Sequence, residues 1–456
     1  MKVIKIGGGC LNGKKTISHI VDLIAERGRG HILVVSALYG LTDFLIDGMT
    51  LALAKEENIP KIMSRLKAKH MIVARHLISR QQALEGFSHN LNKSLRKLER
   101  LYYGLNFTKE ITPRVQDVIS SFGERFSAQL LASTLRDRGI KAVIRMPHDI
   151  GMVTDGKFAD ATANLSKTTR NFQKHLKPPR GSKTILIIPG FFGVSETGDI
   201  TTFGRGGSDY SAAVAAVAAN AEILEIWKDV EGFMSADPRL VPEAQLIPIL
   251  SYEEAAELSY FGAKILHPRS VEPVRVKKIK IAVKNTLDPD ARGSLITARS
   301  PRAKSVIKSV AHDTDIGILK VHASGVGARP GILALVAGRL TESGINIKSV
   351  VTSQTCISLL LSQNDLEPGR LALSGIKPRP YRRLEILEDV ALVGIVGDGL
   401  LHRKGIAARC FSAVASCNVN VEMISFGPSR AALYFLTKRK DLSSAVNAIH
   451  STFFST

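Results

Sequence analysis

The sequence predicts an α/β protein with a large domain over residues 1–300 and two small βαβ modules within residues 301–456. In the large domain, short apolar strands alternate with helical segments, which is the pattern of a largely parallel sheet. The segment SPRAKS, at 300–305, is typical of a linker. Beyond it the chain repeats itself, because GILALVAGRLTESGINIKSV (331–350) has the same pattern as GIAARCFSAVASCNVNVEMI (405–424). Each copy predicts a strand, a glycine turn, a helix, an Asn-containing turn and a second strand.

Four buried strands and the turns that follow them organise the large domain. Strands are expected at residues 3–6, 31–36, 142–144 and 184–188, and helices are expected to begin near Lys15, Thr42, Ser121 and Asp209. Glycine-bearing turns follow three of the strands, with the sequences GGG, SALYG and PGFFG. Ligands of such sheets bind outside the carboxyl ends of the strands, so we expect these turns to meet at one crevice.

Two further regions lack the strand–helix alternation described above. Residues 51–110 are expected to be helical and rich in Lys and Arg, and these charges form either ordinary solvated helix faces or a partner surface. The repeat places the two small modules at about 312–385 and 386–456, with interleaving of their strands left open. Such a pair serves regulation or dimerisation, or is a duplicated structural unit that binds nothing.

Composition restricts the class of protein. The 456 residues are 45% hydrophobic and 23% charged, as in a globular chain, and the formal net charge is +21. That charge suits nucleic acid or small anionic substrates. The single Trp and the dispersed basic residues favour small anions, so no nucleic-acid partner is expected. Without a run of ~20 apolar residues no membrane partner is expected, and four cysteines without a CxxC pair are typical of a cytoplasmic protein.

The segment TTFGRGGSDYSA (201–212) is the strongest functional signal. Its glycines allow positive φ and close approach of the backbone to a ligand. It runs into an alanine-rich helix, whose first N–H groups favour anions. Arg205 adds a guanidinium that matches a carboxylate or phosphate, and Ser208 and Asp209 add polar groups beside it. The segment predicts an anion cradle with a carboxylate inside it, and the alternative is a glycine turn that only begins a helix.

Two candidate charges precede this segment. Lys5 lies beside the glycines Gly7 and Gly8, where its ammonium can neutralise a phosphate. Glu124, in SFGERFS, can hold the ammonium of an amino-acid substrate, or it can merely complement a helix dipole. Each signal is weak when taken alone.

Two later segments supply charges suited to a nucleotide. WKDVEGFMSADPRL contains Lys228, Asp229 and Arg239, although acids and arginine in a turn are also ordinary turn chemistry. SYEEAAELSYFGAKILHPRS contains Lys264 just after a glycine, where a lysine can approach phosphates. The chain lacks the P-loop pattern and the protein-kinase motifs, so a phosphoryl-transfer enzyme of this sequence would belong to another fold.

In this order, the segments resemble those of the aspartate kinases, within the amino-acid kinase family. KIGGGC is similar to the family's KFGGTS, VVSALYGLTD to its VVSA turn, SFGERFS to S-x-G-E-x-x-S and PGFFG to GFIG. TTFGRGGSDYSA differs from TTLGRGGSDYSA at one position, and the two nucleotide-side segments are also similar. The C-terminal repeat resembles the family's paired ACT domains. The resemblance covers nearly the whole chain and implies the family's three-layer kinase domain.

The resemblance also implies a reaction. ATP and L-aspartate would give ADP and L-4-aspartyl phosphate, the first step of lysine, threonine and methionine biosynthesis, and Mg²⁺ would arrive with the ATP. Lys5 and Lys264 would stabilise the transferring phosphoryl group, and Asp209 would orient the site. No metal held by the protein alone is expected.

Further roles follow from the same resemblance. The residues expected to bind aspartate are Ser36, Thr42, Glu124, Arg205 and Ser208. Those expected to bind the nucleotide are Gly7, Gly8, Lys228, Asp229, Arg239 and Lys264. An amino-acid effector at the ACT modules would contact Asn346, Ile347 and Ser353, and a homodimer or higher homo-oligomer would form through these modules.

The sequence departs from the family pattern at a few positions. Gly9 and Cys10 replace a Thr–Ser pair near the phosphate, and Met234 replaces a tyrosine near the nucleotide. Lys348 stands where lysine-inhibited relatives carry an acid, so lysine inhibition through that position is not expected. Two alternatives remain open: a kinase for another acidic substrate, and a degenerate kinase fold that acts as an ACT-based sensor.

Overall fold

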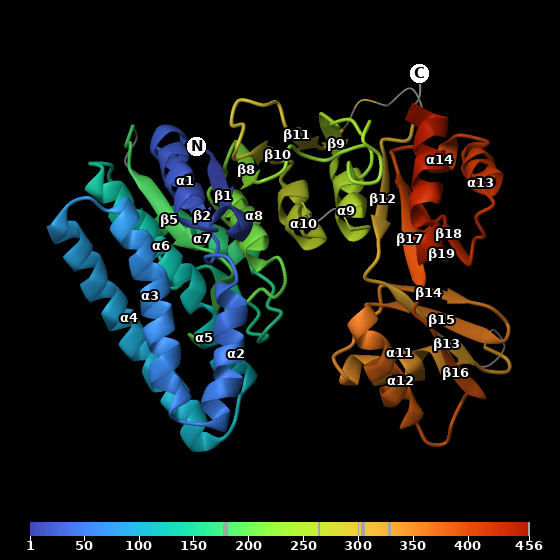
Figure 1. Cartoon of the computed structure of the whole chain (residues 1–456), viewed down its shortest axis with the longest axis horizontal. Coiled ribbons are helices and arrows are strands. Elements are labelled where there is room, and N and C mark those ends of the chain that lie inside the picture. Colours follow the sequence, from blue (N-terminus) through green and yellow to red (C-terminus); the bar gives the residue numbers. More distant parts are fainter. Residues whose placement is uncertain (177–180, 263–264, 300, 302–305, 327–329, 455–456) are drawn as a thin grey trace. The chain divides into compact units, whose positions relative to one another are not determined.

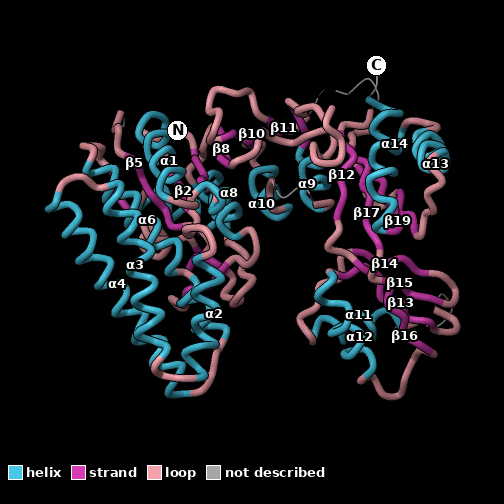
Figure 2. Tube along the Cα trace, in the orientation of Figure 1, coloured by secondary structure: helices cyan, strands magenta, loops and turns pink. Residues whose placement is uncertain are grey.

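The computed structural model describes residues 1–176, 181–262, 265–299, 301, 306–326 and 330–454. They form two compact units (Figure 1, Figure 2). The first unit comprises Met1–Phe233, Leu246–Ala256 and Lys264–Ser300, and the second comprises Met234–Gln245, Glu257–Ala263 and Pro301–Thr456. Two short segments that precede residue 301 therefore group with the second unit. Among the described residues, none of the helices has the length and apolar character that a membrane crossing requires.

A mostly parallel sheet forms the centre of the first unit (Figure 1). Within the described residues its strand order is β3-β5-β2-β1-β8-β10-β11-β9, and β10–β11 is its antiparallel pair. The strands are β1 (Val3–Ile6), β2 (Ile32–Val35), β3 (Ala142–Ile144), β5 (Ile185–Pro189), β8 (Ile223–Lys228), β9 (Ile249–Ser251), β10 (Lys280–Asn285) and β11 (Ser294–Thr297). A small separate sheet holds β4 (Val153–Thr154), β6 (Phe192–Ser195) and β7 (Ile200–Thr202).

Helices cover both faces of the central sheet, which gives three layers. Successive side chains of a strand point to opposite faces. Ile4 and Ile6 of β1 belong to the core that includes α1 (Lys14–Arg27) and α6 (Phe122–Asp137). Lys5 lies on the other face, where α8 (Gly207–Ala218) contacts β1 and β2. The predicted α/β fold with a largely parallel sheet is thus confirmed.

The remaining helices surround these layers. The helical segment expected at 51–110 consists mainly of α3 (Asn58–Leu77) and α4 (Gln81–Thr108). The others are α2 (Leu41–Ala54), α5 (Pro113–Ser120), α7 (Leu165–His175), α9 (Tyr252–Tyr260), α10 (Pro268–Val276) and the 3-10 turn η1 (Gly8–Cys10). Helix α8 is rich in alanine, and its small side chains let it lie buried against the sheet.

The second unit contains two four-stranded antiparallel sheets, in the orders β14-β15-β13-β16 and β12-β17-β19-β18. Their strands are β12 (Ser309–Asp313), β13 (Gly317–His322), β14 (Ser349–Thr352), β15 (Cys356–Leu361), β16 (Arg383–Leu387), β17 (Val390–Val396), β18 (Met423–Phe426) and β19 (Ala432–Lys438). Helices α11 (Ile332–Glu342), α12 (Leu366–Ser374), α13 (Ile406–Ser416) and α14 (Leu442–Phe454) complete the two modules.

The two modules are interleaved in the sequence. Strand β12 pairs with β17, although all of β13 to β16 lies between them along the chain. In each module the repeat forms a βαβ unit, β13-α11-β14 and β17-α13-β18, with another strand between the two parallel strands. The internal repeat read from the sequence therefore corresponds to two copies of one structural unit.

Candidate active site

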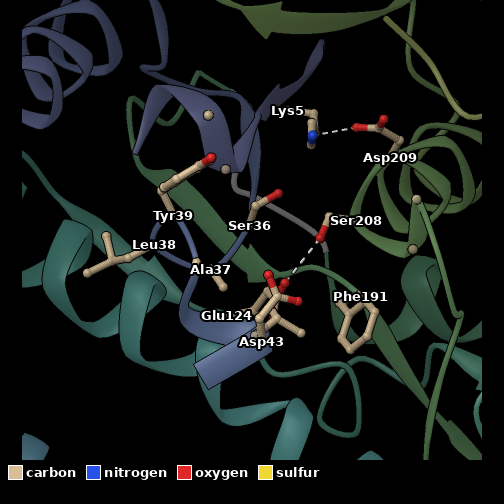
Figure 3. Close-up of a pocket in the computed structure, with 16 residues that line it drawn as sticks. Lys5, Ser36, Ala37, Leu38, Tyr39, Asp43, Glu124, Phe191, Ser208 and Asp209 are labelled. Atoms are coloured by element: carbon tan, nitrogen blue, oxygen red, sulfur yellow. Dashed lines mark hydrogen bonds and ion pairs between the residues drawn. The ribbon is translucent and has the colours of Figure 1, made fainter. Parts of the chain in front are cut away.

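One cavity of about 280 Å³ lies in the first unit, where β1, β2 and the starts of α2 and α8 come together (Figure 3). Parallel strands leave such a crevice at their carboxyl ends. The cavity is lined by Lys5, Gly8, Gly9, Ser36, Ala37, Leu38, Tyr39, Gly40, Thr42, Asp43, Glu124, Phe191, Gly206, Gly207, Ser208 and Asp209. The structure thus brings together seven sequence candidates: Lys5, Gly8, Ser36, Thr42, Glu124, Ser208 and Asp209.

A buried cluster of charges lies at this cavity. The Lys5 ammonium forms an ion pair with one oxygen of the Asp209 carboxylate, and Lys228 lies 3.8 Å from the other oxygen. Burial alone would raise the pKa of Asp209, but the positive charges of Lys5 and Lys228 outweigh burial and the pKa is lowered. Burial lowers the pKa of Lys228, against the attraction of Asp209. The cluster therefore holds an ionised carboxylate that two lysines share.

The Glu124 carboxyl group lies in the same cavity and is only 3% exposed. Ser208 donates a hydrogen bond of 3.2 Å to its Oε1 atom (Figure 3). Its Oε2 atom is buried and has no hydrogen-bond partner among the described residues. Burial raises the pKa of Glu124 to about 8, although backbone N–H groups, Ser208 and Lys5 favour the ionised form. Among the described residues, this carboxyl group therefore has no cationic partner at its Oε2 atom.

Two helices begin at the cavity, and a glycine in left-handed conformation precedes each of them. Gly40 has φ 68° before α2, and Gly206 has φ 72° before α8. A Cβ on Gly206 would also lie 2.3 Å from the Cβ of His267, so a larger residue does not fit there. The free N–H groups and dipole of a helix start favour an anion. The cavity thus combines helix starts with the Lys5 ammonium, and Lys228 lies behind Asp209, which suits a substrate that carries negative charge.

Asp117 supports the segment that leads into α8. Its carboxylate accepts hydrogen bonds from the N–H groups of Ala159 and Thr202, at 2.9 and 2.8 Å, and from the Thr202 hydroxyl at 2.7 Å. Arg269 reaches the same region and donates to the Phe203 carbonyl at 3.1 Å. Sequence reasoning did not single out Asp117, and its place in a plain helical segment gave no signal.

Sequence reasoning also missed several lining residues. It identified the SALYG and PGFFG turns but not Tyr39, Asp43 or Phe191 within them or just after them as site residues. Phe191 has φ 75°, an uncommon conformation for a bulky side chain, and its N–H bonds to the Ser211 hydroxyl at 2.7 Å. Backbone strain of this kind is often found at functional sites.

The other candidates are placed differently. Gly7 follows β1 and donates its N–H to the Trp227 carbonyl at 3.2 Å, beside the cavity. Asp229 is exposed, with its carboxylate next to Gly9. Arg205 is exposed and is not among the described residues that line the cavity.

Arg239 belongs to the second unit, where it pairs with Asp237 at 2.6 Å. Lys264, and residues 300 and 302–305 of the expected linker, lie outside the described residues.

The expected effector residues lie around strand β14. Asn346 and Ser353 are exposed, on either side of the strand, and Ile347 is partly buried against the core of its module. The Lys348 ammonium pairs with Asp313 at 2.9 Å. The structure places these residues in one module.

No group of three or more His, Cys, Asp or Glu side chains among the described residues could hold a metal ion. The Asp209 carboxylate already lies next to the ammonium groups of Lys5 and Lys228. Cys10 is buried, and Thr286 donates to its sulfur at 3.7 Å. The cavity is therefore suited to a metal that arrives on a phosphate rather than one held in a protein cage.

Known proteins match the whole chain. A model of the amino acid kinase family matches residues 1–285, and a model of the ACT domain matches residues 393–453. Aspartokinase 1, chloroplastic, of Arabidopsis thaliana is 30% identical over 463 residues, which cover 99% of this chain and 80% of the relative. The chain belongs to the aspartokinases of the amino acid kinase family.

Solved aspartokinase structures have the same fold. Aspartokinase III of E. coli in complex with aspartate and ADP is 26% identical, with a TM-score of 0.82 and both chains covered completely. The same enzyme in complex with lysine and aspartate is 27% identical, with a TM-score of 0.83 over 100% of this chain and 99% of that one. The aspartate kinase of Clostridium acetobutylicum is 25% identical, with a TM-score of 0.78 and coverage of 99% and 100%. The predicted family, kinase-type domain and ACT modules are confirmed.

Proposed function

We propose that this protein is an aspartate kinase that transfers the γ-phosphoryl group of ATP to the side-chain carboxylate of L-aspartate. The observation that carries the proposal is the cavity that joins Lys5, Asp209 and Glu124 at two helix starts, in a chain of the aspartokinase family. The products are ADP and L-4-aspartyl phosphate. The aspartokinase III structure in complex with aspartate and ADP supports the same pair of ligands for this chain.

In this proposal, the aspartate lies between Glu124 and the start of α8. The substrate ammonium takes the free side of the Glu124 carboxylate, whose Oε2 atom is buried without a partner among the described residues. Binding thereby replaces a neutral carboxyl group with a compensated ion pair. Ser36, Thr42 and Ser208 supply hydroxyl groups to the substrate carboxylates, and Arg205 closes over one of them from its exposed position in the loop.

Phosphoryl transfer then needs positioning and charge neutralisation rather than a protein nucleophile. An oxygen of the substrate side-chain carboxylate attacks the γ-phosphorus, the bond from that phosphorus to the β–γ bridging oxygen breaks, and ADP leaves with the electron pair. Lys5 stabilises the charge on the transferring group, and Asp209 holds the Lys5 ammonium in place. ATP enters as its Mg²⁺ complex, in which the metal neutralises part of the phosphate charge.

For most residues on the nucleotide side of the site, the proposed role comes from the family resemblance. Gly7, Gly8 and Lys228 lie close to Lys5 and are suited to the ATP phosphates. Asp229 lies beside the same glycine turn. The roles of Lys264 and Arg239 remain predictions.

The decisive experiment is ADP release with purified protein, MgATP and three acceptors: L-aspartate, L-glutamate and N-acetyl-L-glutamate. We expect turnover with aspartate and trapping of the acyl phosphate by hydroxylamine. Turnover with another acid alone would establish a kinase of different specificity. Absence of turnover with every acid, in a folded protein that binds ATP, would support the sensor alternative.

We further propose that the ACT modules join two chains and bind an amino-acid effector near Asn346, Ile347 and Ser353, in a cytoplasmic enzyme. The outer strands β14 and β18 expose Val350, 37% accessible, and Ile424, 47% accessible. Exposed apolar edges of this kind favour association. Light scattering would give a mass of at least two chains if the proposal holds.

A further inference from the structure

The rim of the proposed active-site cavity differs from its floor. The floor consists of lining residues that are less than a tenth exposed: Lys5, Ser36, Ala37, Leu38, Glu124 and Asp209. Four lining residues are exposed and form the rim: Gly9, Tyr39, Gly40 and Asp43. Of these four, Tyr39 alone carries an aromatic ring, and it is 59% accessible. The phosphoryl-transfer step proposed above gives this ring no role.

A tight turn places Tyr39 at the rim. Leu41 donates its N–H to the carbonyl of Leu38 at 2.9 Å, and Gly40, with φ 68°, takes the left-handed position that such a turn requires. Tyr39 therefore stands at the corner of the turn, between the buried Leu38 and Leu41.

The backbone of Tyr39 is held on both sides. Its N–H donates to the carbonyl of Leu11 at 3.1 Å, just after the glycine turn that contains Gly8 and Gly9. Its carbonyl accepts a hydrogen bond of 2.7 Å from the Lys69 ammonium of α3. Among the described residues, its hydroxyl group has no hydrogen-bond partner. The ring is therefore free to change rotamer while the main chain stays in place.

The turn lies between the positions proposed for the two substrates. A Cβ on Gly8 would lie 3.3 Å from the Ala37 carbonyl, so the glycine turn proposed for the phosphates packs against this segment. Thr42, proposed to bind aspartate, follows Tyr39 in the first turn of α2. Figure 3 shows Tyr39 and Asp209 on opposite sides of the cavity. A ring that turns inward from Tyr39 therefore covers the place where the γ-phosphoryl group meets its acceptor.

Access of water would compete with the proposed reaction. Water that attacks the γ-phosphorus in place of the substrate carboxylate forms inorganic phosphate, the bond to the β–γ bridging oxygen breaks, ADP leaves with the electron pair, and a proton of the water passes to solvent. Water also cleaves the acyl phosphate product to aspartate and inorganic phosphate. Enzymes suppress such side reactions by excluding water once their substrates are bound.

We propose that Tyr39 shields the reacting phosphoryl group from water. With both substrates bound, its ring turns over the mouth of the cavity and packs on them, whereas in the ligand-free protein it is exposed. An aromatic ring covers a large area with few rotatable bonds, so it closes the mouth at small entropic cost. This inference deepens the proposed kinase function and rests on it. Because the ring provides the shield, a phenylalanine at this position should serve as well.

The ratio of two products tests the proposal on the full chain. With MgATP, L-aspartate and hydroxylamine, the wild type should form about one aspartyl hydroxamate per ADP, because transfer and ADP formation are coupled. Tyr39→Ala should lower this ratio to about one half or less, and it should form ADP without aspartate faster than the wild type does. Tyr39→Phe should keep the wild-type ratio. Tyr103→Ala is the matched control, because Tyr103 is exposed on α4 and is not among the lining residues.

Burial of the ring is measured separately and needs no turnover. Tetranitromethane nitrates accessible tyrosines, and mass spectrometry gives the extent for each of them. A non-hydrolysable ATP analogue with Mg²⁺ and L-aspartate should protect Tyr39 from nitration. Tyr103, which is 38% accessible, should react equally with and without these ligands.

Three results would overturn the proposal: an unchanged product ratio in folded Tyr39→Ala, a ratio lowered as much by Tyr39→Phe as by Tyr39→Ala, or equal nitration of Tyr39 with and without ligands. The melting temperature shows that each variant is folded. A wild type that forms no hydroxamate, although its Tyr39 is protected, contradicts the proposed function and supports the position given to the ring. A wild type that forms hydroxamate, with no change in Tyr39→Ala, contradicts the shielding role alone.

Discussion

Lys5 of β1 and Asp209 in the first turn of α8 form a buried ion pair, with both residues less than a tenth exposed. The pair joins the central strand of the sheet to the helix that begins at the cavity. Because Lys228 also lies 3.8 Å from Asp209, the carboxylate holds two ammonium groups near the position proposed for the phosphates. The arrangement keeps positive charge fixed before the substrates arrive.

Replacement of Lys5 should affect turnover more than binding. We expect Lys5→Met to lower kcat by about 10²–10³, as for loss of one preorganised charge in the transition state. The KM for ATP should change much less. Steady-state kinetics measure both constants, and Lys14→Met, at an exposed helix position, is the control. An unchanged kcat would remove Lys5 from the phosphoryl-transfer step.

Arg205 should act on the amino-acid substrate. We expect Arg205→Ala to raise the KM for aspartate by about tenfold or more, because a charge-assisted fork to a carboxylate is lost. The KM for ATP should be nearly unchanged. Arg205 is exposed, so its replacement should leave the melting temperature unaltered. Equal increases in both KM values would instead assign Arg205 to the phosphates.

Glu124 should make both stability and aspartate binding depend on pH. Its pKa is raised from 4.5 to about 8, so the folded protein keeps a proton that the unfolded chain releases between these values. Stability of the ligand-free protein should therefore decrease as pH rises from about 4.5 to about 8, by up to ~1.4 kcal/mol per pH unit. Denaturant unfolding across this range should show a smaller decrease for Glu124→Gln.

The same proton should compete with the substrate ammonium. We expect the KM for aspartate to rise as pH falls below about 8, because a protonated Glu124 cannot form the ion pair. Aspartate binding should then release a proton, which calorimetry in buffers of different ionisation enthalpy detects. Identical proton release by the wild type and Glu124→Gln would contradict this account.

Asp117 should matter although it does not line the cavity. It accepts three hydrogen bonds, two of them from Thr202. Asp117→Ala should lower the free energy of unfolding by about 3 kcal/mol, because buried donors lose a charged acceptor. Asp117→Asn keeps the shape and should cost less. If chemical denaturation gives equal values for Asp117→Ala and an exposed control such as Asp149→Ala, this support is absent.

The large domain could be predicted because its signals are local. The apolar runs at 3–6 and 31–36 are too short and too uniformly apolar to be amphipathic helices, and glycines follow both. The strands β1 and β2 lie there, with the turns at one cavity. Lys5, Glu124 and Asp209 could be selected because each stands within two residues of a glycine in a motif that resembles a known family.

Other features depend on contacts distant in sequence. No feature of the β12 sequence indicates that this strand pairs with β17. The pairing depends on which strand edges the rest of the module leaves open. A cavity within the second unit is lined by residues of three separated segments, at 257–261, 348–349 and 425–434, and residues at those spacings form no motif. The raised pKa of Glu124 follows from burial, which a sequence cannot give for a residue in the first turn of a helix.

The pairing of β12 with β17 also constrains how this protein is made. During synthesis, β12 leaves the ribosome well before its partner strand, and the last strand, β19, follows only after the other module is complete. Until then β12 exposes an open hydrogen-bonding edge, which is prone to association with other chains. A chain that stops before β17 would keep that edge permanently. Nonsense mutations between the codons for β12 and those for β17 should therefore yield insoluble product rather than an unregulated enzyme.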